Sequence, residues 1–88
     1  MEIILEIKKR NRDFGIITWP YSLDFEIKSM FELKDTINIE FGDKIFKRRK
    51  VSYKYRRISI GKKRIEALGK KKIFILIKNK DTIQINAK

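Results

Sequence analysis

The stretch Lys47–Lys63 reads KRRKVSYKYRRISIGKK and contains nine basic residues and no acidic residue. Its apolar and aromatic side chains occupy odd-numbered positions up to residue 55 and even-numbered positions from residue 58 onwards. Successive side chains of a strand point to opposite faces of the sheet. If residues 51–60 formed one continuous strand, this change from odd to even positions would therefore direct part of the apolar side chains toward water. We therefore predict a bulge or bend at Arg56–Arg57, which would also redirect both arginines.

The charge of the whole chain is as uneven as this stretch suggests. Residues 1–44 contain seven Lys/Arg and nine Asp/Glu, whereas residues 45–88 contain sixteen Lys/Arg and two acids, and the formal net charge is +12. A basic surface of this kind has to meet a negative partner, and the phosphate backbone of a nucleic acid is the usual one. A surface that only keeps a protein in solution usually mixes both signs, so we predict a nucleic-acid partner.

The composition excludes several classes of catalytic site. The chain has no cysteine and no histidine, which removes disulfides, thiolate metal sites and every Ser-His-Asp or Cys-His arrangement. The acidic residues show no spacing typical of a metal-assisted phosphodiesterase. We therefore expect a non-catalytic protein with no cofactor and no metal.

Length and hydropathy set the expected organisation and location. Eighty-eight residues predict one domain, residues 1–88. No apolar run approaches the roughly 18 residues that a membrane span needs, and residues 1–6 do not read as a signal peptide. We therefore expect a cytoplasmic protein with no membrane partner.

The acidic first half predicts strands separated by a polar turn and a helix. Glu2–Lys8 alternates like a half-buried strand, Lys9–Asp13 reads as a polar turn, and Phe14–Trp19 reads as a second strand that Pro20 ends. The next segment fits either an alternating strand or a helix, and we favour a helix over about Leu23–Phe31. Its expected N-cap is Ser22, and Trp19 is expected to close the core.

A hairpin and a second set of elements follow. Asp35–Phe41 alternates with three apolar residues inward, and Gly42-Asp43 predicts a hairpin turn. Beyond the basic stretch we expect a short helix over Lys62–Leu68 that ends at Gly69 and a solvated loop at Lys70–Lys72. A central strand at Ile73–Ile77, a turn at residues 79–81 and a last strand at residues 82–85 complete the predicted order.

The order of elements repeats. Residues 2–46 and 47–88 both read strand, strand, short helix, strand, hairpin, strand, and Gly15–Pro20 in the first half corresponds to Arg56–Gly61 in the second. The predicted fold class is therefore mainly β with one or two short helices. We expect a small barrel of two ββαββ-like repeats, of the swapped-hairpin or cradle-loop type.

These motifs resemble the AbrB/MazE-type swapped-hairpin DNA-binding family. Gly15, Ile17 and Pro20 match its Gly-Arg-Ile-x-Ile-Pro strand, as do the second-half residues Arg57, Ile58 and Ile60. Residues 33–37 resemble its Gly-Asp-x-Val/Ile strand without the glycine. The resemblance implies two interlocking units in one chain, as in MraZ, and DNA contact through arginines.

The sequence departs from this family at specific positions. Ile16 stands where the family arginine would be, so the resemblance leaves Arg57 and its neighbours to carry DNA binding. A double-psi barrel or an OB-type barrel would give much the same sequence pattern.

The candidate contact residues are basic, because guanidinium groups make forked bonds to phosphate or guanine and lysines act as point charges. They are Arg48, Arg49, Lys54, Arg56, Arg57, Lys62, Lys63 and Arg64. Tyr53 and Tyr55 either belong to the core or form a stacking platform for unpaired bases.

Three functions remain open. The first is duplex DNA binding in transcription regulation, and the second is binding of single-stranded DNA or RNA. The third is an inhibitor or accessory subunit, of the kind encoded by phages, that contacts another protein through its acidic first half.

Overall fold

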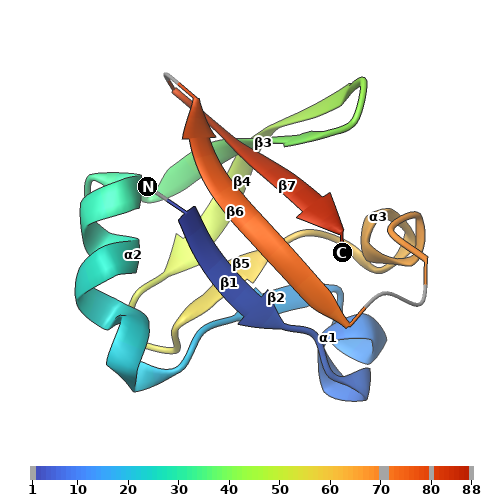
Figure 1. Ribbon diagram of the computed structural model, residues 1–88, viewed down its shortest axis with the longest axis horizontal. Helices are drawn as coiled ribbons and strands as arrows, with labels where there is room; N and C mark the ends of the chain where they lie inside the picture. Colours follow the sequence, from blue (N-terminus) through green and yellow to red (C-terminus); the bar gives the residue numbers. More distant parts are fainter. Residues whose placement is uncertain (1, 70–71, 80, 88) are drawn as a thin grey trace.

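A computed structural model describes residues 2–69, 72–79 and 81–87. Seven strands form one sheet in the order β1-β6-β7-β3-β4-β5-β2, curled into a nearly closed barrel (Figure 1). The elements are β1 (Glu2–Glu6), α1 (Lys9–Phe14), β2 (Ile16–Thr18), the 3₁₀ turn η1 (Tyr21–Leu23), α2 (Asp24–Phe31), β3 (Thr36–Phe41), β4 (Lys44–Ser52), β5 (Arg57–Ser59), α3 (Lys62–Glu66), β6 (Ile73–Asn79) and β7 (Thr82–Ala87). The mainly β barrel is confirmed, with three short helices where one or two were predicted.

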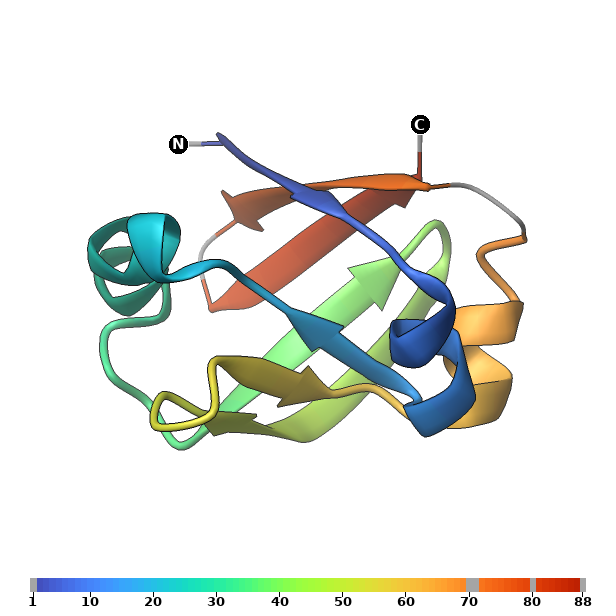
Figure 2. The same ribbon diagram turned by 90° about the horizontal axis from the view of Figure 1, so that it is seen from below.

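The barrel is flattened into two layers, which Figure 2 shows edge-on. One layer contains β1, β6 and β7, and the other contains β3, β4, β5 and β2, with β3 and β7 joined by parallel pairing. The core between them is aliphatic and aromatic, and its fully buried side chains are Leu5, Ile17, Ile27, Phe31, Ile39, Ile58, Ile60, Ile65, Phe74, Leu76 and Ile85. Such burial of apolar surface is the main term that stabilises a small domain.

Alternating strands are correctly predicted wherever one of their faces is buried. In β1, Ile3 and Leu5 are buried and Ile4 is exposed, as the alternation indicates. In β3 the inward residues Ile37, Ile39 and Phe41 are all buried, and residues 42–43 form the predicted hairpin turn into β4. Trp19 also lies in the core, with its ring packed edge-on against Phe31.

The polar turn predicted at Lys9–Asp13 is wrong, because these residues form the helix α1. Its first turn is closed by the Asn11 side chain, whose Oδ1 accepts the Lys8 backbone N–H at 2.9 Å. Gly15 ends the helix in the left-handed conformation. The helix takes Phe14 from the predicted second strand, which shortens to β2, and leaves that ring exposed.

The predicted helix over Leu23–Phe31 is confirmed as α2, but its predicted N-cap is wrong. Ser22 lies inside the 3₁₀ turn η1 that leads into the helix, and Leu23 occupies the N-cap position without a side-chain hydrogen bond. Asp24 and Glu26 lie in the first turn, where carboxylates favour the helix dipole.

The turn between β4 and β5 explains the change of parity in the basic stretch. Residues 53–56 form a tight turn, and β4 and β5 pair as a hairpin with Val51 opposite Ile58. Arg56 adopts a positive φ of 51° in this turn, so the predicted bend is a chain reversal. A bulge lies earlier, where the pairing with β3 shifts and the backbone N–H of Arg48 donates to Asn38 Oδ1.

The second half follows the predicted order. The short helix α3 is confirmed with Ile65 buried, and β6 lies between β1 and β7, as expected for a central strand. The outer face of β6 is uncovered, because Ile73 is exposed and Ile75 is half-buried. The predicted loop at 70–72 and turn at 79–81 include residues outside the described part of the chain.

The two stretches matched in the repeat lie side by side. β2 and β5 pair antiparallel with Ile17 opposite Ile58, and both side chains are fully buried. These two residues occupy equivalent positions in the matched stretches, so the pair is centred on a local two-fold relationship. Helical segments follow both strands. The repeat and the resemblance to the swapped-hairpin family remain predictions.

Candidate nucleic-acid interface

The eight candidate cations fall into two groups at the two ends of β5. Lys54 and Arg56 lie in the β4–β5 turn and Arg57 begins β5. Lys62, Lys63 and Arg64 lie on α3, directly after β5, while Arg48 and Arg49 lie on β4. Since a strand rises about 3.3 Å per residue, the two groups are about 10 Å apart along β5.

The group at the turn surrounds an exposed aromatic ring. Tyr55 is 60% exposed, and its ring centroid lies 5.4 Å from Lys54 Nζ and 5.0 Å from Arg57 Cζ. Arg56 Cζ lies 5.7 Å from the ring of Tyr21, which is also exposed. Cations at these distances are attracted to the negative ring faces and hold their guanidinium or ammonium groups near the rings. The turn therefore presents positive charge and aromatic surface together.

The group at α3 is tied to the backbone that follows β5. Arg49 Nη1 and Arg64 Nη1 both donate to the carbonyl oxygen of Ile60, at 3.3 and 3.4 Å. Arg64 Cζ also lies 4.8 Å above the Phe46 ring. Arg49 is half-buried and its Nε is buried without a hydrogen-bond partner among the described residues. These contacts fix two guanidinium groups beside the barrel end and leave other N–H donors for a ligand.

Tyr53 and Tyr55 have different environments. The Tyr53 hydroxyl donates to the carbonyl oxygen of Lys34 at 2.6 Å, and its ring packs edge-on against Trp19. Burial, followed by the charge of Asp35, raises the pKa of Tyr53 to about 12. Tyr53 therefore belongs to the edge of the core, and only Tyr55 is available for stacking.

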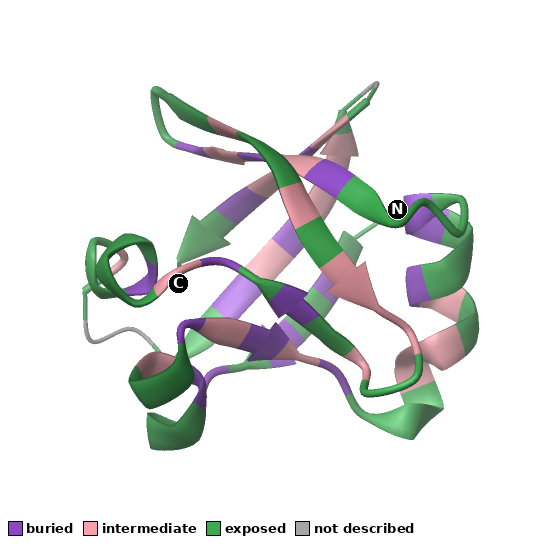
Figure 3. Cartoon of the chain, turned by 180° about the vertical axis from the view of Figure 1, so that it is seen from behind, coloured by how far each residue is buried: buried purple, intermediate pink, exposed green. Residues whose placement is uncertain are grey.

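The outer faces of the two layers differ in charge. Lys47 and Lys50 of β4 and Arg57 of β5 are exposed on one layer, which Figure 3 shows from behind. On the opposite layer the pairing places Glu2, Ile4 and Glu6 outward, beside the outward residues of β6 and β7. Those β6 and β7 residues are Ile73, Ile75, Ile77, Asn79, Thr82, Gln84 and Asn86. Outward positions on these three strands, within the described ranges, therefore carry no cation.

Ion pairing does not account for the candidate cations, although the charge of Arg56 helps to lower the pKa of Asp24. Within residues 2–69, 72–79 and 81–87, ion pairs join Asp24 to Lys28 and link Glu32 with Lys34 and Lys78, and Asp81 with Lys34. None of these pairs includes one of the eight candidates. Their charge is therefore available to an external anion.

Sequence reasoning missed a contribution from α1. Arg10 and Phe14 line a shallow groove of about 350 Å³ together with Ile16, Arg57 and Ser59. Phe14 is 71% exposed at its edge. Gly15, which closes α1, was the available signal for a helix C-terminus.

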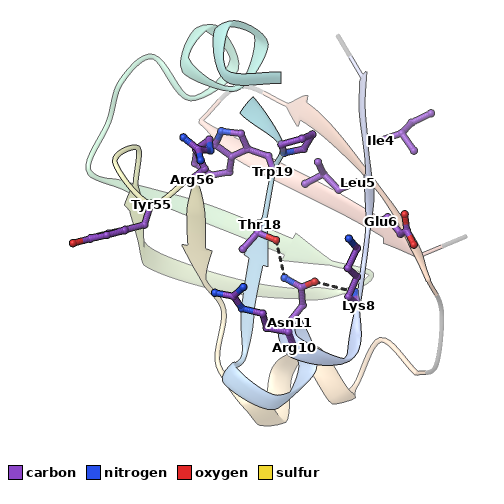
Figure 4. Close-up of a pocket in the computed structure, with 11 residues that line it drawn as sticks. Ile4, Leu5, Glu6, Lys8, Arg10, Asn11, Thr18, Trp19, Tyr55 and Arg56 are labelled. Atoms are coloured by element: carbon purple, nitrogen blue, oxygen red, sulfur yellow. Dashed lines mark hydrogen bonds between the residues drawn. The ribbon is translucent and has the colours of Figure 1, made fainter. Parts of the chain in front are cut away.

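The barrel is open at one seam, between β1 and β2. A groove of about 620 Å³ follows this seam and is lined by Leu5, Trp19 and cations from three segments (Figure 4). These cations are Lys8, Arg10 and Arg56. The buried Asn11 side chain bridges one end of the seam, since its Nδ2 donates to Thr18 Oγ1 at 3.0 Å while its Oδ1 binds the Lys8 N–H.

Comparisons with known proteins give no relative. No family model, no curated protein and no solved structure matches this chain. In the part of the chain that the structure describes, no cluster of three or more acidic residues could hold a metal ion. The same part contains no helix long and apolar enough to cross a membrane.

Proposed function

We propose that this protein binds nucleic acid, without catalysis, through the surface formed by the β4–β5 turn, the outer faces of β4 and β5, and α3. The observation that carries the proposal is the one-sided charge. Eight cations lie around this surface without ion pairs in the described residues, whereas the outward charges of the opposite layer are Glu2 and Glu6. A polyanion would be attracted to one side of the barrel and held at a defined orientation.

Duplex DNA is the first candidate, with transcription regulation as the role. Phosphate contacts made by guanidinium and ammonium groups release counterions, so binding should weaken steeply as salt is raised. Each neutralised phosphate adds about −0.9 to the slope of log K against log salt on B-DNA.

Single-stranded nucleic acid is the second candidate, and the exposure of Tyr55 favours it. The charged groups of Lys54 and Arg57 lie beside this ring. Proteins that bind single strands combine such elements, because bases stack on aromatic rings while cations contact the phosphate backbone. Phe14 adds a second exposed ring in the groove that Arg57 lines.

The deciding experiment compares three ligands of the same base sequence. Fluorescence anisotropy with duplex DNA, single-stranded DNA and RNA, repeated at several salt concentrations, gives affinity and salt slope for each. The double variant Arg56→Ala/Arg57→Ala should weaken binding and reduce the magnitude of the slope by about 2.

The matched control is Lys28→Ala/Lys34→Ala, which removes two charges that already have carboxylate partners on or near α2. Its affinity and slope should stay close to those of the wild type. Affinities that do not change with salt for any of the three ligands would contradict the proposal.

A further inference from the structure

We infer that the open seam between β1 and β2 binds an extended, acidic segment of a partner protein, which pairs with the free strand edges and closes the barrel. This inference uses a different surface from most of the proposed nucleic-acid interface, and it stands or fails independently of that function. It starts from the backbone at the two sides of the seam.

The free edge of β1 is identified by its pairing with β6. The backbone N–H of Ile7 donates to the Lys72 carbonyl oxygen. In an antiparallel pair the hydrogen-bonded positions alternate, so odd-numbered residues of β1 direct their backbone groups toward β6. The backbone groups of Ile4 and Glu6 therefore point away from β6 and into the seam, and β1 pairs with no other strand in the described chain.

The free edge of β2 follows in the same way. Ile60 N–H donates to the Gly15 carbonyl oxygen at 2.9 Å, and Trp19 N–H donates to the Arg56 carbonyl oxygen at 3.1 Å. Positions 15, 17 and 19 therefore face β5, and the backbone groups of Ile16 and Thr18 point away from it. Of these two residues Thr18 lines the seam groove, opposite Ile4 and Glu6, and within the described residues no backbone hydrogen bond engages these three positions on the seam side.

The groove has room for a short strand. Its volume is about 620 Å³, Leu5 and Trp19 contribute apolar lining, and Ile4 at its margin is 60% exposed. At about 3.3 Å per residue, three to four extended residues would span the length of β2. An unpaired edge of this kind is a template for an added strand.

The chemistry of the seam favours a peptide over a polynucleotide. Strand edges offer donors and acceptors in alternation, which another peptide backbone complements, whereas a phosphodiester backbone only accepts. The charged lining consists of Lys8, Arg10 and Arg56 against Glu6, so acidic side chains on the added strand would be attracted.

Charge also argues against a second copy of this chain in the seam. If the β1 strands of two copies paired antiparallel about Ile4, Glu2 of each copy would lie opposite Glu6 of the other. Two pairs of like charges would therefore face each other. Like charges directly opposite one another destabilise a strand pair. An acidic segment of a partner protein therefore fits the charge of the groove better than a second copy of this chain does.

The test is an NMR titration of the full chain with a capped seven-residue peptide of alternating valine and glutamate. The control peptide has lysine in place of glutamate. We expect the acidic peptide to move and protect from exchange the amides of Ile4, Glu6 and Thr18, and the lysine peptide to bind at least about tenfold more weakly.

Two variants make the test sharp. Ile4→Pro removes a seam-facing N–H without removing a bond to β6, because proline is tolerated at a strand edge, and it should weaken peptide binding about tenfold. Ile4→Val keeps that N–H and should bind like the wild type. Arg10→Glu leaves both strand edges intact and should weaken the acidic peptide, which keeps the inference testable if the proline variant fails to fold.

Three outcomes would overturn the inference. The acidic peptide could fail to bind, it could bind with the same affinity to Ile4→Pro and Ile4→Val when both are folded, or a single-stranded oligonucleotide could move the same three amides and displace the peptide. The last result would assign the seam to the nucleic-acid surface. Absence of nucleic-acid binding alongside peptide binding would refute only the proposed function.

Discussion

The Tyr53 hydroxyl donates a hydrogen bond of 2.6 Å to the backbone carbonyl oxygen of Lys34. This bond ties the β4–β5 turn to the segment that joins α2 to β3. The hydroxyl of Tyr55, two positions later, makes no such bond to any residue that the structure describes, and this residue is 60% exposed. The same turn therefore has one tyrosine anchored to the body of the barrel and one presented to solvent.

Tyr53→Phe should destabilise the protein by about 1 kcal/mol, because it removes this hydrogen bond and leaves the Lys34 carbonyl without its donor. Tyr55→Phe should change the free energy of unfolding by less than about 0.5 kcal/mol, as is usual for surface substitutions. Urea denaturation of the two variants measures both effects. Equal losses of stability would contradict the separate environments of the two rings.

Tyr53 also makes stability depend on alkaline pH. Its pKa is raised to about 12 in the folded protein from the ordinary value of 10.0, which we assign to the unfolded chain. The resulting contribution to stability is present below pH 10 and is lost as pH rises toward 12, because the unfolded chain releases the proton first. Chemical denaturation at several pH values should show this loss in the wild type and less of it in Tyr53→Phe.

Asp24 gives the opposite dependence at acidic pH. A hydrogen bond from Trp19 Nε1, with help from Lys28 and Arg56, holds the pKa of Asp24 below its ordinary value of 3.8. Its contribution to stability is therefore present above about that pH and is lost as pH falls through the lowered folded value. Asp24→Asn should reduce this part of the acid dependence, which the fluorescence of Trp19 can follow during unfolding. An unchanged acid profile in Asp24→Asn would contradict it.

Gly15 fills a position where no side chain fits. Its φ is 63°, and a Cβ there would lie 2.5 Å from the carbonyl carbon of Gly61 and closer still to Lys62 N. Gly15→Ala should therefore cost about 2–4 kcal/mol, from backbone strain and the clash at the start of α3. The control is Gly42→Ala, where φ is also positive but the space is open, so thermal denaturation should show a cost of only about 1 kcal/mol.

Tyr55→Leu separates the two nucleic-acid candidates. Loss of a base–aromatic stack costs about 1–3 kcal/mol, so affinity for single-stranded ligands should fall about 5- to 150-fold if that candidate is right. Affinity for duplex DNA should change little, because the cations are retained. Anisotropy with both ligands decides between them, and Tyr53→Leu is unsuitable here because it would also disturb the core.

The strands were predictable where burial imposes a period. β1 and β3 each place alternate side chains against the core, so their faces could be read from the order of residues. β4 gave a weaker signal because it contains no buried residue and is interrupted by the bulge at Arg48. Residues 53–56 form a turn, where side chains do not alternate between two faces as they do in a strand. The spacing of Tyr53 and Tyr55 therefore could not predict which of them is buried.

The candidate site was only partly predictable, because half of its geometry comes from contacts distant in sequence. The charge of residues 47–64 located the basic surface. The helix α1 was hidden by its polar composition, although Asn11 closes its first turn and Gly15 ends it. The position of Phe14 and Arg10 beside Arg57 depends on the pairing of β2 with β5, which no local pattern specifies.

The partner of β1 has a consequence for biosynthesis. Glu2 lies opposite Ile77, and Glu6 lies opposite Ile73, so the only strand that pairs with β1 among the described residues is synthesised well after β1. A ribosome must release the chain through β6 before Ile3 and Leu5 leave water. Contacts this distant in sequence slow folding and prolong exposure of apolar segments. We therefore expect the nascent chain to rely on chaperones until β6 has left the ribosome.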